Sequence, residues 1–154
     1  MKRVMFISSV GGHLTQMLQL KSLFNDYDYM LVTEKTKTTF DLKNKFRVYF
    51  LLHCSRKYLM DFVIKFVFNS IKSLFLFIQF RPDIIVTTGT HTAVPMCFLG
   101  WLARKKVIFI ESFAKRTSPT LSGRLVYPIV STFVVQWESM LKFYKKAQLW
   151  GWIY

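Results

Sequence analysis

Short apolar runs alternate along this chain with longer stretches in which apolar residues recur at helical spacing. The pattern predicts six strands: Val4–Ser9, Tyr29–Thr33, Phe46–Leu52, Ile84–Thr87, Val107–Ile110 and Thr132–Gln136. It predicts four helices: His13–Phe24, Lys57–Phe80, Thr92–Ala103 and Glu138–Lys145. This alternation is typical of an α/β fold. We therefore expect a Rossmann-like parallel sheet in a single domain covering residues 1–154.

The predicted helix at about 57–80 is apolar over most of its circumference. Its polar members are Lys57, Asp61, Lys65, Asn69 and Lys72. Because they are spaced by four, four, four and three residues, they fall on one stripe of the helix. The wide apolar face that remains includes Phe66, Phe75 and Phe77.

Three placements of this helix are open. A transmembrane span would bury charges such as Asp61 at about 2.5–3.5 kcal/mol each near the bilayer centre. A core helix would require so small a domain to cover a very wide apolar face. An interfacial helix, with its charged stripe toward water and its Phe and Leu face in lipid, fits best. Lys57, Lys65 and Lys72 would then mark the polar side of a membrane-binding helix.

The charge balance points to anionic partners. The formal net charge is +14, the hydrophobic fraction is 52%, and 16 residues are Phe. Abundant Phe and Lys suit an anionic membrane surface better than a nucleic-acid groove, and no nucleic-acid-binding motif is present, so no nucleic-acid partner is expected. Cys54 and Cys97 lack metal-ligand or redox spacing and are expected to be buried free thiols. No metal or other cofactor is expected.

Two glycine-containing loops follow predicted strands. Ser9-Val10-Gly11-Gly12-His13 joins the first strand to a helix. The glycines allow close approach of a ligand, and a helix N-terminus offers free N–H groups to phosphate. Thr88-Gly89 follows the fourth strand at the same edge, where open α/β sheets bind ligands. The alternative is a tight turn without a ligand, in which His13 is only a polar cap.

An acidic residue follows the fifth strand. Glu111 comes directly after four apolar residues and precedes Ser112. A carboxylate at this edge can bind a sugar hydroxyl or act as a base. The alternative is a structural Glu111 paired with one of the many Lys and Arg residues.

Several segments together resemble a known family. They are SSVGGHL, RPDIIVTTG with AVP, IFIESFAKRTSPTLSGRLVYP, FVVQWE and the terminal GWIY, in an order that covers essentially the whole chain. The chain resembles the acceptor-side subunit of two-component UDP-sugar transferases, which help add the second sugar to a polyprenyl or dolichol diphosphate carrier. Bacterial members serve capsular and exopolysaccharide assembly, and the pneumococcal capsule galactosyltransferase enhancers are the most similar. A eukaryotic relative serves the second N-acetylglucosamine of the N-glycan precursor.

The resemblance implies a division of labour. The chain would correspond to the N-terminal half of a GT-B glycosyltransferase, inactive alone, while a separate subunit binds the UDP-sugar. It would act at the cytoplasmic face of the plasma membrane. Catalysis would fall to His13 or Glu111, and the acceptor diphosphate would be bound by Ser9, Gly11, Gly12, Thr88, Gly89 and Ser112. Val10 stands where relatives usually carry Ser, Thr or Gly, so a hydroxyl donor to phosphate would be missing.

The chain ends with large apolar side chains where a frayed polar terminus is usual. Trp150, Trp152, Ile153 and Tyr154 are predicted to form the partner interface, because exposed Trp and Tyr are favoured interface anchors. The alternative is a tail that folds back onto the domain's own core. An alternative function also stays open: a non-catalytic adaptor that only recruits a partner enzyme to the membrane.

Overall fold

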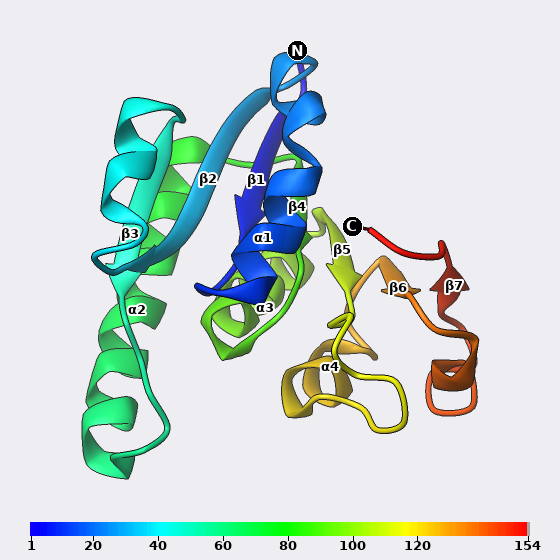
Figure 1. Cartoon of the computed structure of the whole chain (residues 1–154). Helices are drawn as coiled ribbons and strands as arrows, with labels where there is room; N and C mark the ends of the chain where they lie inside the picture. Colours follow the sequence, from blue (N-terminus) through cyan, green and yellow to red (C-terminus); the bar gives the residue numbers. More distant parts are fainter. Residues whose placement is uncertain (154) are drawn as a thin grey trace.

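The computed structural model describes residues 1–153 and contains one seven-stranded sheet in which all neighbouring strands are parallel (Figure 1). The strands are β1 Arg3–Ile7, β2 Asp28–Lys35, β3 Val48–Leu52, β4 Ile84–Thr87, β5 Lys106–Ile110, β6 Thr132–Val135 and β7 Gln148–Leu149. Their spatial order is β3-β2-β1-β4-β5-β6-β7. The order reverses direction between β1 and β4, and such a switch point is where open α/β sheets bind ligands. The α/β fold class and the six predicted strands are confirmed.

The connections are helical. They include four α-helices, α1 Gly12–Gln19, α2 Leu59–Phe80, α3 Val94–Leu102 and α4 Leu121–Val126. Four 3-10 segments accompany them: η1 Lys21–Asn25, η2 Phe40–Asn44, η3 His91–Ala93 and η4 Glu138–Met140. The predicted helix His13–Phe24 divides into α1 and η1. The predicted helix Glu138–Lys145 is wrong, since only one 3-10 turn forms there before the chain extends into β7.

Both faces of the sheet are buried, as in other parallel sheets. On one face, alternate strand residues such as Met5, Ile7 and Phe109 pack with side chains of α2, α3 and α4. On the other face, residues such as Phe6 and Val134 pack with α1 and η1. Figure 1 shows α1 on one side of the sheet and the long α2 on the other. The carboxyl ends of the strands therefore open between two helical layers.

Candidate functional site

The loop after β1 is shaped by Gly11. Its φ of +72° lies in the left-handed region, which favours glycine. Gly11 is also the N-cap residue of α1, and its carbonyl accepts the N–H of Thr15 at 3.0 Å. Because glycine has no side chain with which to cap the helix, the first N–H groups of α1 are left for an anion. Ser9 is buried beside them, with its hydroxyl 3.4 Å from the carbonyl oxygen of Val10.

His13 joins this loop to the loop after β4. Its Nδ1 donates to the carbonyl oxygen of Thr88 at 2.8 Å, and the Thr88 hydroxyl donates to the His13 carbonyl at 2.7 Å. Gly89 has a φ of +91°, and a Cβ there would lie 3.5 Å from His13 Nδ1. The N–H of Gly89 donates to the Thr87 hydroxyl at 3.0 Å. The structure thus brings the two predicted glycine loops together and holds His13 with Nε2 as its proton-accepting nitrogen.

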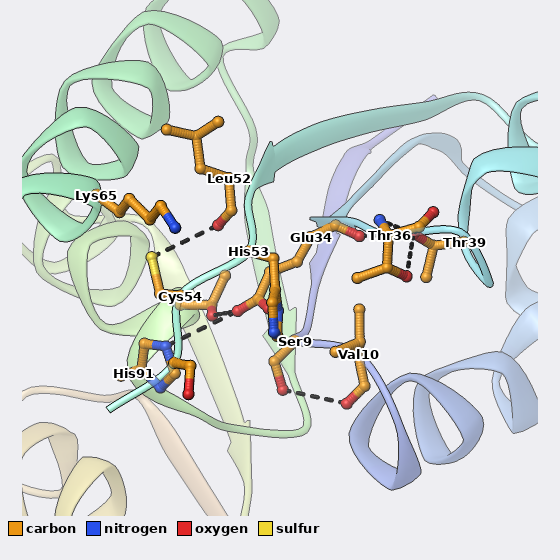
Figure 2. A network of polar contacts seen from close by, with 12 residues as sticks. Ser9, Val10, Glu34, Thr36, Thr39, Leu52, His53, Cys54, Lys65 and His91 are labelled. Atoms are coloured by element: carbon orange, nitrogen blue, oxygen red, sulfur yellow. Dashed lines mark hydrogen bonds and ion pairs between the residues drawn. The ribbon is translucent and has the colours of Figure 1, made fainter. Parts of the chain in front are cut away.

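A second buried carboxylate, which the sequence interpretation missed, lies at the same edge. Glu34, near the end of β2, is 1% exposed, and its Oε2 lies 2.5 Å from Nδ1 of His53. Thr92 donates its hydroxyl to Oε1, and Nε2 of His91 lies 3.8 Å from that oxygen. Figure 2 shows the side chains of His53 and His91 turned toward Glu34. The signal was available, because Glu34 follows the buried run Leu31–Thr33 much as Glu111 follows its own strand.

All three histidines of the chain share this neighbourhood. Burial lowers the pKa of His91, the Glu34 carboxylate opposes that effect, and Arg56, His53 and His13 lower the pKa further. Glu34 and these three other side chains therefore lie within electrostatic reach of His91. The open edge therefore combines one buried carboxylate with three imidazoles and one guanidinium, which is an environment for a phosphorylated ligand and for proton transfer.

Unpaired polar atoms concentrate at the same edge. Within residues 1–153, five buried side-chain oxygen or nitrogen atoms lack a hydrogen-bond partner. Four of them lie in the last part of β2 or after β1 and β4: the hydroxyls of Thr33, Ser8 and Thr90, and Nε2 of His91. Buried polar groups are normally paired, so a group of such atoms at a strand edge supports a ligand site there.

Glu111 is placed differently from the prediction. It is 1% exposed, and its carboxylate accepts hydrogen bonds from the Thr120 hydroxyl at 2.9 Å and the Tyr144 hydroxyl at 2.7 Å. The N–H of Ser112 also donates to it at 2.9 Å. A Cβ at Gly123 would lie 2.3 Å from its Oε2, so the space around it is full. These contacts fasten β5 to α4 and to the segment before β7, so Glu111 stabilises the domain. The alternative of a structural glutamate applies, with hydroxyl partners in place of Lys or Arg.

The predicted polar stripe of α2 does not face water as a whole. Asn69 is buried and holds the end of β3, accepting the N–H of Leu52 and donating to its carbonyl, both at 2.8 Å. Lys65 is half-buried and pairs with Asp61 at 2.7 Å, whereas Lys57 and Lys72 are exposed. The physical reason is that β3 presents an end that needs a hydrogen-bonding partner, and Asn69 supplies it.

The outer face of α2 is apolar and exposed. Ten apolar side chains of this helix are more than two-fifths exposed: Leu59, Met60, Val63, Ile64, Val67, Phe68, Ile71, Leu74, Phe75 and Ile78. Of the three predicted lipid-facing residues, only Phe75 belongs to this face; Phe66 and Phe77 are half-buried, and Phe77 packs against the core. No helix within residues 1–153 is both long and apolar enough to cross a membrane.

An apolar groove lies between this helix and His91. It has a volume of about 270 Å³ and is lined by Arg56, Phe62, Phe66, His91, Val94, Leu121, Ser122 and Leu125. Its walls come from the start of α2, from α3 and from α4. Arg56 and His91 are its charged or titratable lining residues, and Ser122 is its remaining polar one.

The C-terminal tail divides between core and surface. β7 adds to β6, and the N–H of Trp150 donates to the carbonyl of Val135 at 3.3 Å. Ile153 packs against the core, and its N–H donates to the side chain of Gln136 at 3.0 Å. Trp150 and Trp152 are more than half exposed, and Trp152 lies 5.1 Å from Trp137 between ring centroids. Tyr154 lies outside the described residues.

Solved structures show which class of domain this is. The chain superposes on MurG of Acinetobacter baumannii with a TM-score of 0.73 and 14% identity, over 90% of this chain and 43% of MurG. It superposes on a UDP-N-acetylglucosamine 2-epimerase of Rickettsia bellii with a TM-score of 0.72 and 12% identity, over 94% of this chain and 41% of the epimerase. The chain therefore spans less than half of each. Its fold is the Rossmann-like α/β domain of GT-B-type proteins.

Sequence comparison identifies the family. A family model described as "Oligosaccharide biosynthesis protein Alg14 like" matches residues 4–153, and the chain belongs to this family. The "UDP-N-acetylglucosamine transferase subunit ALG14" of Debaryomyces hansenii is 30% identical over 96% of this chain and 75% of that protein. The human protein of the same name is 26% identical over 96% and 81%. A Schizosaccharomyces pombe relative is 40% identical, but over only 46% of this chain and 36% of its own length. The predicted glycosyltransferase-subunit family is confirmed.

Proposed function

We propose that this chain is the membrane-associated, acceptor-binding subunit of a two-subunit UDP-sugar glycosyltransferase. Its ligand would be a sugar linked to polyprenyl diphosphate, and a separate subunit would bind the UDP-sugar. The observation that carries the proposal is a juxtaposition in one domain. An apolar groove lined by His91, Arg56 and side chains of α2, α3 and α4 lies at the sheet edge that also carries the glycine loop at the start of α1, and the outer face of α2 is apolar and exposed. Such an arrangement suits a ligand that is a diphosphate at one end and a hydrocarbon at the other.

The names of the relatives support the need for a partner. The chain spans 43% of MurG, and relatives in its family are named as transferase subunits. In a GT-B enzyme the substrate cleft lies between two α/β halves. The exposed Trp150 and Trp152, beside the open edge strand β7, are the surface we assign to the partner, with Tyr154 as a further predicted contact. We expect negligible sugar transfer by this chain alone.

The proposal also covers the donor sugar and the biosynthetic pathway. The names of the relatives favour N-acetylglucosamine, whereas the resemblance to capsule galactosyltransferase enhancers favours galactose. We propose bacterial capsular or exopolysaccharide assembly as the setting. The test is transfer from radiolabelled UDP-N-acetylglucosamine or UDP-galactose to a polyprenyl-diphosphate sugar, by this chain, by its co-expressed partner and by both. Transfer that requires both subunits is expected. Robust transfer by either subunit alone would contradict the division of labour.

The membrane proposal places the exposed face of α2 in the headgroup region at the cytoplasmic face of the plasma membrane. The net charge of +14 favours an anionic leaflet. Replacing Phe68, Ile71 and Phe75 by Glu should release the protein to the soluble fraction without unfolding it, since all three side chains are more than three-fifths exposed. The matched control is Ser22, Asn25 and Thr38 replaced by Glu, which changes the charge equally at exposed polar positions. Equal sedimentation of both triple variants with membranes would contradict a lipid-facing α2.

A further inference from the structure

Glu34 is a buried carboxylate that lies against histidines. Within residues 1–153 the imidazole nitrogens that come within 4.0 Å of its oxygens are Nδ1 of His53 and Nε2 of His91. Its backbone is also held, because the Thr39 hydroxyl donates to the Glu34 carbonyl at 2.7 Å (Figure 2). Burying a carboxylate costs free energy unless the carboxylate is well paired. For Glu34 the shorter of the two imidazole contacts is with His53.

The contact defines the state and the direction of that imidazole. Nδ1 of His53 lies 2.5 Å from Oε2 of Glu34, so Nδ1 carries the proton and donates. Nε2 is then the nitrogen with the free electron pair, and it points away from Glu34 because the two nitrogens lie on different sides of the ring. The His53 side chain is 49% exposed, so a substrate can reach it from the open edge.

His13 is held by a different kind of group. Its Nδ1 donates to a backbone carbonyl, which orients the ring but carries no charge. It also lies at the second position of α1, where the positive end of the helix dipole favours an anion. A carboxylate opposite Nδ1, by contrast, stabilises the imidazolium that forms when Nε2 accepts a proton. The surroundings of His13 therefore suit contact with a diphosphate, and those of His53 suit proton transfer.

The position of His53 agrees with this division. It follows β3 directly and lies three residues before Arg56, which lines the apolar groove. A lipid-linked acceptor bound in the groove would therefore lie against Arg56 and His91, and both His53 and His91 contact the Glu34 carboxylate.

We propose that His53 is the general base of sugar transfer and that Glu34 is its positioning residue; the inference rests on the proposed function. Nε2 of His53 takes the proton of the acceptor hydroxyl as the hydroxyl oxygen forms a bond to the anomeric carbon of the UDP-sugar. The bond between that carbon and the UDP oxygen breaks, and UDP leaves with the electron pair. The proton passes from His53 to solvent before the next turnover.

The test uses the complex of this chain with its partner, isolated before assay, with both substrates varied. His53→Asn should lower kcat by about 10²–10⁴-fold while the KM for the acceptor stays close to normal. The acid limb of the pH–rate profile, where the base takes up a proton, should disappear. Glu34→Gln should lower kcat in the same direction. Asp41→Asn, a carboxylate-to-amide change at an exposed position, is the matched control and should leave the rate unchanged.

An independent variant distinguishes a base from a structural tether. In His53→Gly, added imidazole should restore part of the lost kcat, which it would not do if His53 only anchored the loop before α2. A His53→Asn complex with a normal rate and a normal acid limb would overturn the inference, as would loss of that limb in His13→Asn alone. A wild-type complex that transfers no sugar to any lipid-linked acceptor would instead contradict the proposed function.

Discussion

Glu34 and Glu111 begin from the same local pattern and end in different roles. Each follows a buried apolar run, and each is 1% exposed. Glu111 accepts hydrogen bonds from the hydroxyls of Thr120 and Tyr144 and from the backbone N–H of Ser112. None of these donors has a second nitrogen that could accept a proton from a substrate. Glu34 meets imidazoles, whose second nitrogen can face a substrate. The difference shows that the partners of a strand-end carboxylate, more than its burial or its position, decide whether it serves stability or chemistry.

Removing the Glu111 carboxylate should produce the largest loss of stability. In Glu111→Ala the hydroxyls of Thr120 and Tyr144 lose their acceptor, and each buried donor without a partner costs about 1–3 kcal/mol. A cavity adds to the loss. Urea unfolding followed by circular dichroism should show a drop of several kcal/mol for Glu111→Ala and a smaller one for Glu34→Gln. The reverse order would show that Glu34 contributes more to stability than Glu111.

Tyr144 offers a smaller and pH-dependent test of the same site. Burial and the Glu111 carboxylate raise the pKa of this phenol above its ordinary value of 10.0. The folded protein therefore keeps the proton while the unfolded chain loses it, so the stabilisation is complete below about pH 10 and is lost as the pH rises above it. Tyr144→Phe should cost about 1.5–3 kcal/mol at neutral pH, the range for a hydrogen bond to a charged group. It should also flatten the alkaline fall in the unfolding free energy. An unchanged alkaline fall in Tyr144→Phe would exclude this phenol as its source.

Replacing His91, which lies near Glu34, should have the smallest effect on stability of the three changes. Its pKa is lowered, chiefly by burial, from the ordinary value of 6.5. The unfolded chain thus takes up a proton before the folded protein does, so stability is present above pH 6.5 and declines as the pH falls below it toward the lowered pKa. His91→Gln should make thermal unfolding less sensitive to acid across that window. If the variant kept the full acid sensitivity, His91 would not be its source.

Much of the fold was decided locally and was therefore predictable. Six strands and the positions of the glycine loops follow from apolar runs and from residues with special backbone freedom, which are properties of short segments. β7 was missed because two residues, Gln148 and Leu149, carry no periodicity; pairing with β6 makes them a strand. The predicted helix Glu138–Lys145 is wrong although its apolar residues have helical spacing. The chain forms one 3-10 turn there and then extends to pair with β6 at the edge of the sheet.

The side-chain partners were decided only by the tertiary structure. Charge, the wide apolar face of α2 and the family resemblance were all present in the sequence. The sequence could not show that Asn69 turns inward to Leu52, because that depends on where β3 ends relative to a helical residue seventeen positions later. Nor could it show that His53 and His91, 19 and 57 residues after Glu34, meet its carboxylate while Glu111 is enclosed by Tyr144. Periodicity determines which face of a helix or strand is buried. The contacts between distant strand ends exist only after the sheet has assembled. Those contacts distinguish Glu111, the structural carboxylate, from Glu34, which faces the site.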